Sequence, residues 1–494
     1  MHAQARGDTL QPENDMLTST NRRQPALALV EWLLVLARTW FLLMPLLGPG
    51  LSLAEQKPFV QLQQEFIDLR FGLFIHFNIP TFSTDDWPDP QMPAAAFNPT
   101  QLNCRQWAEA AKSARMTYGC LTAKHHSGFC IWDTKSTDYN VMKSPLKRDV
   151  VKEYADAFRE AGLKVMMYYS ILDTHHDLRR GHVTARHIAL VKQQLTELFS
   201  NYGEITALFI DGWESPWARI SYDEIPFEDI YRLIKSLQPN CLVMDLNASK
   251  YPSTALFYGD IKSYEQNAGE SMDRQGNRLA SMACLPVNKQ WFWKEDYPSG
   301  PVKSSKTIVE SNLVPLNRAY CNFILNVAPN RQGLIDDNAL ALLKEVGDRW
   351  RPEEKMPLLE APEAPIISPN IAKFKPASSS WSWDTQISDF GNDDDFKTYW
   401  ESNINVKEPW YAVDLVNEQP FNMIVLTVPR KGIREYRLQY FAEGTWKDIP
   451  SAPNDRIVKI HRFDRVWGSR VRVQFPNNGI QPAIAELGVY NERR

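Results

Sequence analysis

Polar residues suited to catalysis or hydroxyl binding follow several short apolar stretches of the sequence. Residues 205–217, "ITALFIDGWESPW", run through apolar side chains to Asp211, and a glycine and two tryptophans follow. Three other apolar stretches end in the same manner, at His76, at His125–His126 and at Tyr168–Tyr169. If these stretches are parallel strands of one barrel, their carboxyl ends meet over one pocket. A carboxylate beside histidines and tyrosines is suited to nucleophilic or acid–base catalysis.

The adjacent histidines place a condition on this pocket. Neighbouring residues on a regular strand point to opposite faces, so His125 and His126 reach one ligand only where the strand is already turning. Ser127 and Gly128 permit such a turn. A metal site is the other use for these rings and for the later His175–His176 pair. Because no HExxH or comparable spacing accompanies them, we favour hydroxyl-binding histidines and predict no metal ligands.

The apolar periodicity indicates which elements hold these side chains. Strand-like runs alternate with amphipathic helical patterns, which is typical of a parallel sheet buried on both faces. Six runs are clear strands: 71–77, 118–126, 163–170, 205–211, 241–247 and 321–327. Helical patterns start near 101, 149, 184 and 226, and Thr184 is placed to cap the third. A span of about 300 residues favours an α/β fold with a (β/α)8-like barrel, although six strands and not eight are apparent.

The pattern changes after residue 350. Residues 351–369 are rich in proline and glutamate, which is typical of a linker. From 370 to 494, short alternating runs are separated by turns, and this predicts an antiparallel β-sandwich. The predicted architecture is a barrel followed by a C-terminal β-sandwich.

The N-terminal region has the pattern of an export signal. After Arg38, an apolar run is followed by glycine and proline and then by Ser52-Leu53-Ala54, which predicts cleavage after Ala54. An uncleaved membrane anchor is the less favoured alternative, because Glu31 and Arg38 interrupt the apolar run. We therefore predict a signal region over 1–54, a mature chain without a membrane span, and a periplasmic or extracellular location.

Composition narrows the class of function. The 494 residues are 44% hydrophobic and 23% charged, as in ordinary globular proteins, and allow two or three domains. With a net charge of -4 and no basic block, the sequence predicts no nucleic-acid partner. The 16 tryptophans are compatible with stacking on sugars. Six cysteines, none in a CxxC pair, argue against structural zinc, but disulfides and buried thiols both stay open.

Five stretches together resemble the successive signatures of retaining α-L-fucosidases of glycoside hydrolase family 29. They are "RFGLFIHFNIP", "AKHHSGFCIWDTKSTDYNV", "YYSILDTHH", "LFIDGWE" and "NFILNVAPNRQGLI", in the family's order. The stretches "SSSWSWDTQ", "PWYAVDLV" and "AIAELGVYN" are similar to discoidin or coagulation factor 5/8 type C modules, which often bind carbohydrate. The resemblance implies a catalytic barrel over 55–350 and a carbohydrate-binding module over 370–494.

The resemblance also implies roles for individual residues. Family members hydrolyse α-L-fucosides with retention, through a covalent intermediate on an aspartate, and Asp211 matches that position. His76, His125 and His126 match the histidines that bind the fucose hydroxyls. Tyr169 matches the tyrosine near the nucleophile.

Two assignments are less direct. Trp291 resembles the tryptophan that packs on the apolar face of the sugar, and Trp293 is the alternative. The general acid/base varies in position within the family, and Glu265 is the first choice, with Glu270, Glu214 and Glu295 as alternatives. The stretch "MACLPVNKQW" and Thr174 depart from the family pattern, and both bear on the acid/base and on the leaving group.

We therefore expect an exported retaining α-L-fucosidase that acts on fucosylated oligosaccharides or polysaccharides without a metal or organic cofactor. The C-terminal module helps to dock the substrate and could hold a structural calcium ion, although no ligands for it are recognisable. A catalytically silent carbohydrate-binding protein on the same scaffold is the alternative from another class. Among enzymes, hydrolysis of α-L-galactosides is an expected side activity, because an apolar pocket rejects one extra hydroxyl poorly. The sequence makes no prediction of oligomeric state.

Overall fold

The computed structural model describes residues 56–493, apart from 216, 247–249, 266–271, 354–355, 357 and 361. The predicted export signal and its cleavage site lie outside these residues. Within them, no helix is long and apolar enough to cross a membrane.

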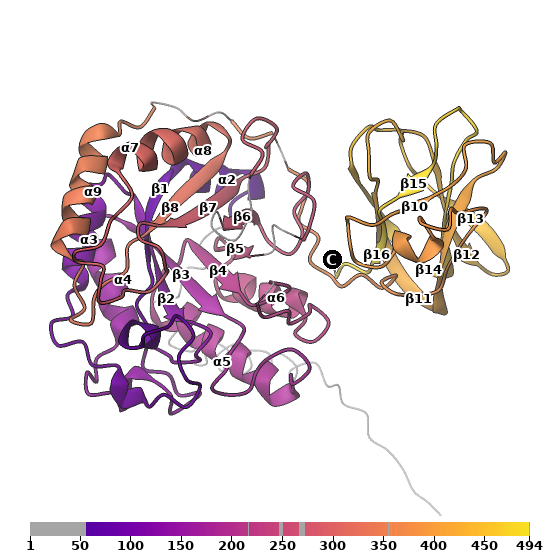
Figure 1. Cartoon of the computed structure of the whole chain (residues 1–494). Coiled ribbons are helices and arrows are strands. Elements are labelled where there is room, and N and C mark those ends of the chain that lie inside the picture. Colours follow the sequence, from indigo (N-terminus) through magenta and orange to yellow (C-terminus); the bar gives the residue numbers. More distant parts are fainter. Residues whose placement is uncertain are drawn as a thin grey trace, which may run out of the picture. The chain divides into compact units, whose positions relative to one another are not determined.

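Eight parallel strands close into a barrel, which confirms the predicted fold (Figure 1). The strands are β1 Phe71–Ile75, β2 Tyr118–Lys124, β3 Lys164–Ser170, β4 Ala207–Asp211, β5 Leu242–Asp245, β6 Ile261–Glu265, β7 Ser281–Pro286 and β8 Cys321–Asn326. Closure is direct, because β8 pairs with β1 in parallel and Ile324 lies opposite Gly72. The carboxyl ends of all eight strands therefore meet at one rim.

Two of these strands were not apparent from the sequence. β6 carries Lys262, Ser263 and Glu265, and its polar composition hides it from a search for apolar runs. All five of its residues are buried, and the ammonium group of Lys262 donates a hydrogen bond to the backbone carbonyl of Tyr251 at 2.9 Å. β7 is also fully buried and ends in a proline. The polar strand β6 is stable because the closed barrel supplies partners that are distant in sequence.

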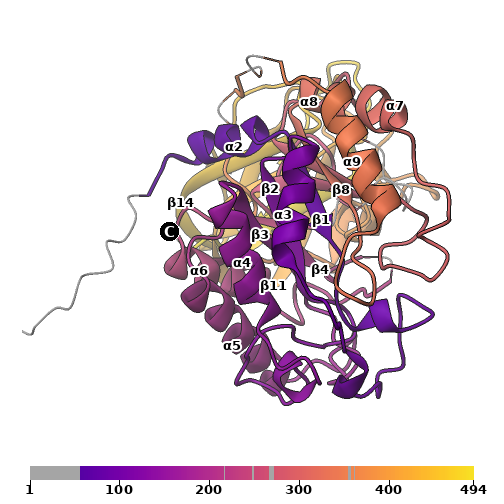
Figure 2. The ribbon, with the colours of Figure 1, turned by 90° about the vertical axis from the view of Figure 1, so that its left-hand side faces the viewer.

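Helices surround the barrel, and α3, α4 and α9 lie side by side on its outside (Figure 2). The helices are α2 Phe59–Asp68, α3 Cys104–Ser113, α4 Val150–Glu160, α5 Ala185–Asn201, α6 Phe227–Leu237, α7 Ser305–Ile308, α8 Val314–Arg318 and α9 Asp337–Arg349. Shorter turns are the 3-10 helices Ile79–Phe82, Ala94–Ala96, Val141–Lys143 and Ser388–Gly391, and the π-helical turn Val309–Leu313. Thr184 caps α5 as predicted, and its hydroxyl accepts from the amide of His187.

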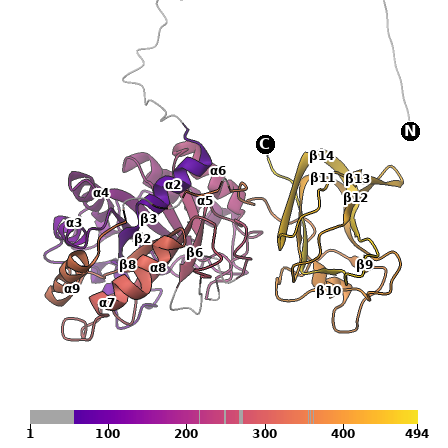
Figure 3. The ribbon, with the colours of Figure 1, turned by 90° about the horizontal axis from the view of Figure 1, so that it is seen from above.

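The C-terminal region is an antiparallel β-structure, again as predicted. Its strands are β9 Ala377–Ser379, β10 Trp400–Glu401, β11 Trp410–Thr427, β12 Arg437–Ala442, β13 Thr445–Ile449, β14 Val458–Gln474, β15 Ala483–Ile484 and β16 Glu486–Tyr490. The larger sheet has the order β13-β12-β14-β11-β16, and β10 pairs with β15 in a second, two-stranded sheet. The long strands β11 and β14 lie side by side (Figure 3). Among the short runs expected as separate strands, 409–416 and 422–429 fall largely within the single strand β11, and 456–463 and 469–475 within β14. The two long strands pair with register shifts after Asp414 and Phe421.

The stretch 351–369, predicted as a linker, makes ordered contacts where it is described. Ile366 is fully buried. Its amide donates to the carbonyl of Leu256, and its own carbonyl accepts from the amide of Tyr258. This part of the stretch therefore packs on the chain between β5 and β6.

Candidate active site

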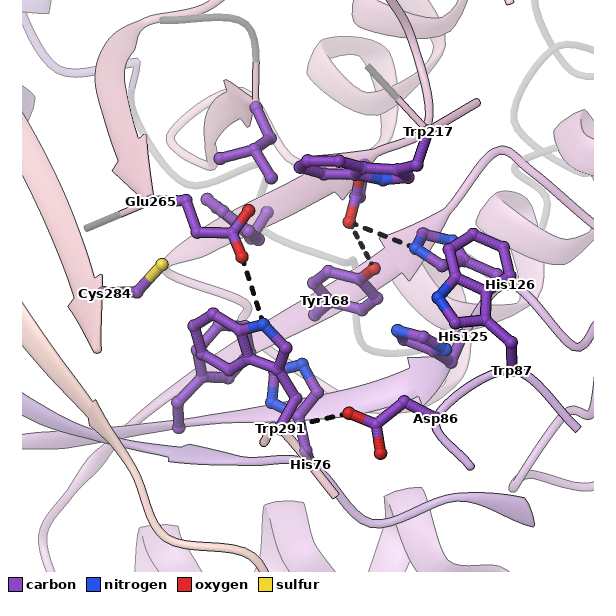
Figure 4. A pocket seen from close by; sticks show the side chains of 14 residues that line it. His76, Asp86, Trp87, His125, His126, Tyr168, Trp217, Glu265, Cys284 and Trp291 are labelled. Atoms are coloured by element: carbon purple, nitrogen blue, oxygen red, sulfur yellow. Dashed lines mark hydrogen bonds and ion pairs between the residues drawn. The ribbon is translucent and has the colours of Figure 1, made fainter. Parts of the chain in front are cut away.

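A cavity of about 190 Å³ opens at the carboxyl ends of the barrel strands (Figure 4). Its lining is Phe74, His76, Asp86, Trp87, His125, His126, Tyr168, Phe209, Asp211, Trp217, Leu246, Glu265, Cys284 and Trp291. Aromatic and aliphatic side chains form much of this wall, and a few polar groups converge on it, as in small-molecule sites.

Asp211 ends β4 and is held at both carboxylate oxygens. The hydroxyl of Tyr168 donates to Oδ2 at 2.7 Å, and the indole N–H of Trp217 lies 3.3 Å from Oδ1. His126 Nε2 is 3.6 Å from Oδ2. The next residue, Gly212, has a φ of +105°, and a Cβ there would lie 2.8 Å from the backbone nitrogen of Leu172. Glycine therefore lets the chain turn sharply just past this carboxylate.

The prediction for Tyr169 is wrong, because its neighbour Tyr168 reaches the site. The hydroxyl of Tyr169 donates to Oε1 of Gln194 on α5 at 2.6 Å, on the outside of the barrel. Side chains alternate along a strand, so only one of two adjacent tyrosines can point inward. β3 pairs with β4 so that Tyr168 lies opposite Phe209, and both side chains face the barrel interior.

Three buried histidines line the cavity and are held as neutral rings. Burial, as the largest cause, lowers the pKa of His76 to about 3, despite a 2.8 Å contact of its Nδ1 with Asn326 Oδ1. Burial also lowers the pKa of His126, and lowers that of His125 still further with the help of the two neighbouring rings. His126 Nδ1 lies 2.7 Å from the hydroxyl of Ser170. Neutral imidazoles can hydrogen-bond sugar hydroxyls without introducing charge.

The adjacent histidines share the cavity because β2 ends at Lys124, one residue before them. The amide of Gly128 donates to the carbonyl of His125 at 3.0 Å, and Gly128 has a φ of +80°. The expected turn is therefore present, and both rings line the cavity.

The His175–His176 pair does not line the cavity. His175 Nδ1 lies 2.7 Å from the carbonyl of Pro90, and His176 Nδ1 lies 2.8 Å from Asp173 Oδ2. In the described ranges, no group of three or more His, Cys, Asp or Glu side chains is placed to hold a metal ion.

Glu265 ends β6, lines the cavity and is 8% exposed. Its Oε1 accepts from the indole N–H of Trp291 at 3.0 Å, across the cavity from His126 (Figure 4). The alternatives lie elsewhere: Glu214 is paired with Lys250, and Glu295 is an exposed side chain paired with Arg331. Glu270 lies outside the described residues.

Of the two candidate tryptophans, Trp291 lines the cavity. Its ring centroid is 4.9 Å from that of His76, and its carbonyl accepts from the amide group of Asn326 at 2.7 Å. Trp293 instead donates its indole N–H to Asp336 at 2.7 Å. Asn326, at the end of β8, thus orients both a histidine and a tryptophan of the site.

Sequence reasoning missed Asp86 and Trp87 as cavity residues, and for Trp217 it left two roles open, a wall of the pocket or packing of its loop; Trp217 lines the cavity. Asp86 accepts from the amide of Trp291 at 3.1 Å and pairs with Lys294 at 2.9 Å. Trp87 is 45% exposed, and its ring stacks on His126 with centroids 4.7 Å apart. These residues lie on loops, where no periodicity marks them. The one sequence feature that could have indicated them is the acidic residue Asp86 directly before a tryptophan, Trp87.

All six cysteines lie in the described part of the chain and are buried, and none is joined to another by a disulfide.

Comparison with known proteins identifies the chain. The family model described as alpha-L-fucosidase matches residues 86–352, more than half of the sequence. A second model, described as a NedA-like, galactose-binding domain, matches residues 390–473. The chain is 27% identical over 455 residues to alpha-L-fucosidase 1 of Arabidopsis thaliana, covering 85% of each protein.

Two further similarities agree with this match. The tissue alpha-L-fucosidase of Homo sapiens is 24% identical over 319 residues, which cover 55% of this chain and 63% of that protein. The crystal structure of SpGH29 has the same fold, with a TM-score of 0.51 and 22% identity, covering 88% of this chain and 98% of that one. The chain therefore belongs to the α-L-fucosidase family, glycoside hydrolase family 29, and is a glycosidase with a C-terminal galactose-binding-type domain.

Proposed function

We propose that this protein hydrolyses terminal α-L-fucosyl residues with retention, with Asp211 as nucleophile and Glu265 as general acid/base. The observation that carries the proposal is the fixed carboxylate of Asp211, which has a donor at each oxygen. A nucleophilic carboxylate must be aimed at one atom, and these two donors fix the orientation of the carboxylate.

The mechanism has two displacements. In the first, an oxygen of Asp211 attacks C1 of the fucosyl group, the glycosidic bond breaks, and Glu265 gives its proton to the departing oxygen. In the second, Glu265 takes a proton from water, and the oxygen of that water attacks C1 and releases Asp211. Two inversions at C1 leave the product with the configuration of the substrate.

Glu265 fits the acid/base role better than the other acid of the cavity. Asp86 already has an ammonium partner, Lys294, and accepts from the amide of Trp291. Glu265 lines the same cavity, and its Oε1 accepts from the indole N–H of Trp291. It also projects from the end of a barrel strand, as Asp211 does, so the scaffold fixes the positions of both carboxylates.

The rest of the cavity suits a deoxysugar. The neutral rings of His76, His125 and His126 provide contacts for hydroxyl groups, while Trp291 and Phe74 provide an apolar wall for the C6 methyl group and the apolar face of the ring. We propose that the substrate is a fucosylated oligosaccharide or polysaccharide, and that the C-terminal module helps to dock it. We further propose export, on the basis of the sequence before residue 55.

The test is release of the aryl group from an aryl α-L-fucoside by residues 55–494. We expect turnover by the unsubstituted chain, loss of turnover in Asp211→Asn, and recovery of Glu265→Ala activity on addition of azide. Glu295→Ala is the control and should keep full activity, because Glu295 is an exposed side chain outside the cavity. NMR should show the α-anomer as the first product. Fucose binding without turnover would favour a carbohydrate-binding protein.

Export has a separate test. The full chain is expressed in a bacterial host, and the periplasmic and secreted fractions are sequenced from the N-terminus. We expect a mature protein that begins at Glu55. A chain that stays in the cytoplasm with its N-terminus intact would contradict the proposal.

A further inference from the structure

The loop that follows Asp211 carries the donor of one of the two hydrogen bonds to its carboxylate. We call residues 212–215 and 217–220 the nucleophile loop; it carries Trp217, whose indole N–H faces Oδ1 of Asp211. Glu214, within this loop, has a φ of +48°, a left-handed conformation that is costly for a residue with a Cβ. Such a conformation persists only where the surrounding structure holds it.

A chain of ion pairs holds Glu214 from outside the barrel. Its Oε2 lies 2.8 Å from Nζ of Lys250, and the same ammonium lies 2.8 Å from Oδ2 of Asp394. Asp394 belongs to the C-terminal module, within the region that matches the galactose-binding model. Nζ of Lys373 also pairs with Oδ2 of Asp394, at 2.7 Å. The nucleophile loop is thus joined to the module through one lysine.

This network differs from an ordinary surface ion pair. The four side chains are between 12% and 20% exposed, so solvent screens them only in part. Removing one partner of such a cluster leaves charge that is poorly solvated.

The module holds its end of the network firmly. The amide of Asp394 donates to Glu486 Oε2 at 3.1 Å, and Glu486 is 2% exposed on β16. Glu486 Oε1 accepts in turn from the side-chain amide of Asn370 at 3.0 Å. The backbone of Asp394 is therefore held by a buried side chain of strand β16.

Apolar contacts run beside the ion pairs. Phe396, two residues after Asp394, packs against Tyr251 and Phe257, with ring centroids 5.3 and 5.7 Å apart. Tyr251 directly follows Lys250. Tyr490 of β16 belongs to the same buried cluster as the barrel residues. The connection is therefore packed as well as charged, and it can transmit a constraint on position.

From these contacts we propose that the C-terminal module is a positioning element of the active site: Asp394, through Lys250, holds Glu214 and thereby keeps Trp217 against the carboxylate of Asp211. The module then contributes to the chemical step as well as to docking of the glycan. Lys250 and Asp394 are positioning residues, because neither lines the cavity. The inference rests on the proposed role of Asp211 as nucleophile.

The test uses an aryl α-L-fucoside, because so small a substrate has no glycan chain for the module to dock. For Asp394→Asn and Lys250→Met we expect kcat to fall about 10- to 100-fold, the scale of loss when a reacting group is displaced by about 1 Å, with KM changed less than about threefold. The double variant should be no slower than the worse single variant, since both remove one link. Lys250→Arg keeps the charge and should recover most of kcat.

The matched control is Asp448→Asn. Asp448 is also a module aspartate with a cationic partner, Arg437, but it lies on β13 and makes no contact with the nucleophile loop among the described residues. It should keep the kcat of the parent chain. If Asp394→Asn and Lys250→Met also keep it, the module acts only in docking and the inference is wrong.

A second measurement separates this inference from the proposed mechanism and from misfolding. A 2-deoxy-2-fluoro-α-L-fucosyl donor should label Asp211, and mass spectrometry gives the rate. No label on Asp211 in the parent chain would overturn the nucleophile assignment. Labelling at an unchanged rate in Asp394→Asn would overturn the positioning role alone. Glu214→Gln breaks the network from the barrel side, leaves the module intact, and should slow labelling equally; its failure to do so would also contradict the inference.

Discussion

The hydroxyl of Tyr168 lies 2.7 Å from Oδ2 of Asp211, whereas the hydroxyl of the next residue, Tyr169, lies 2.6 Å from Gln194 on the outside of the barrel. Burial, together with the negative charge of Asp211, raises the pKa of Tyr168 well above its ordinary value. Its proton therefore stays on the phenol, and Tyr168 is a permanent donor to the proposed nucleophile.

This pair of tyrosines gives a sharp comparison. Tyr168→Phe should lower kcat/KM for an aryl α-L-fucoside about 10- to 100-fold, because a hydrogen bond to a charged group contributes roughly 1.5–3 kcal/mol. Tyr169→Phe should leave kcat/KM within about twofold and lower the free energy of unfolding by about 1 kcal/mol. Steady-state kinetics and urea unfolding of both variants check this. Equal kinetic losses in the two would contradict the assignment.

Asn326 should govern sugar affinity although it does not line the cavity. Its side chain contacts His76 Nδ1 and donates to the carbonyl of Trp291. Asn326→Ala removes the contacts that orient the His76 ring and the Trp291 backbone. We expect fucose to bind about 10-fold more weakly, the cost of roughly one or two hydrogen bonds. Competitive inhibition by fucose measures this. Asn338→Ala, which removes a bond to the carbonyl of Tyr297 instead, is the control and should leave inhibition unchanged.

Breaking the fully buried ion pair Lys124–Asp173 should lower the free energy of unfolding far more than breaking an exposed ion pair. Nζ of Lys124 lies 3.3 Å from Oδ2 of Asp173, and both side chains have no solvent exposure. Lys124→Met leaves a buried carboxylate without its cation and should lower the free energy of unfolding by about 3–5 kcal/mol. The double variant with Asp173→Leu should recover part of this loss. Lys152→Met, in an exposed pair, should leave urea unfolding unchanged.

The buried histidines should make the fold sensitive to acid. The pKa of His76 is about 3 in the fold against an ordinary value of 6.5, and the pKa values of His125 and His126 are also lowered. As the pH falls below about 6.5, the unfolded chain binds protons that the folded chain does not, so the free energy of unfolding decreases, by up to about 1.4 kcal/mol per pH unit for His76.

Urea unfolding at pH 7, 6 and 5 measures this slope. His76→Gln removes one of these histidines. The free energy of unfolding of this variant should therefore change less steeply with pH than that of the parent chain, by the uptake of about one proton. A parent stability that is the same at pH 7 and pH 5, or a slope that His76→Gln does not change, would contradict the expectation.

The sequence determined the fold class because the barrel is built from repeated local patterns. Short apolar runs, helical periodicity and the cap at Thr184 each depend on neighbouring residues alone. The carboxyl ends of parallel barrel strands also converge by geometry, so the sequence alone places Asp211 and His76 in one pocket.

The tertiary structure decided what depends on register and on distant partners. Whether Tyr168 or Tyr169 faces inward follows from the pairing of β3 with β4, and a one-residue difference reverses it. β6 is polar and acquires its partners only when the barrel closes, so the choice of Glu265 depended on its distance along the sequence from Asp211 and not on a recognisable strand.

Dependence on distant partners is also why the sequence did not predict the loop residues of the site or the connection between the barrel and the module. Trp217 and Asp86 have no periodic neighbours, and Lys250 meets Asp394 across 144 residues of sequence. Local sequence therefore determined the elements and the chemical types at their ends. The contacts that aim those side chains join residues far apart in the chain, and only the folded structure brings such residues together.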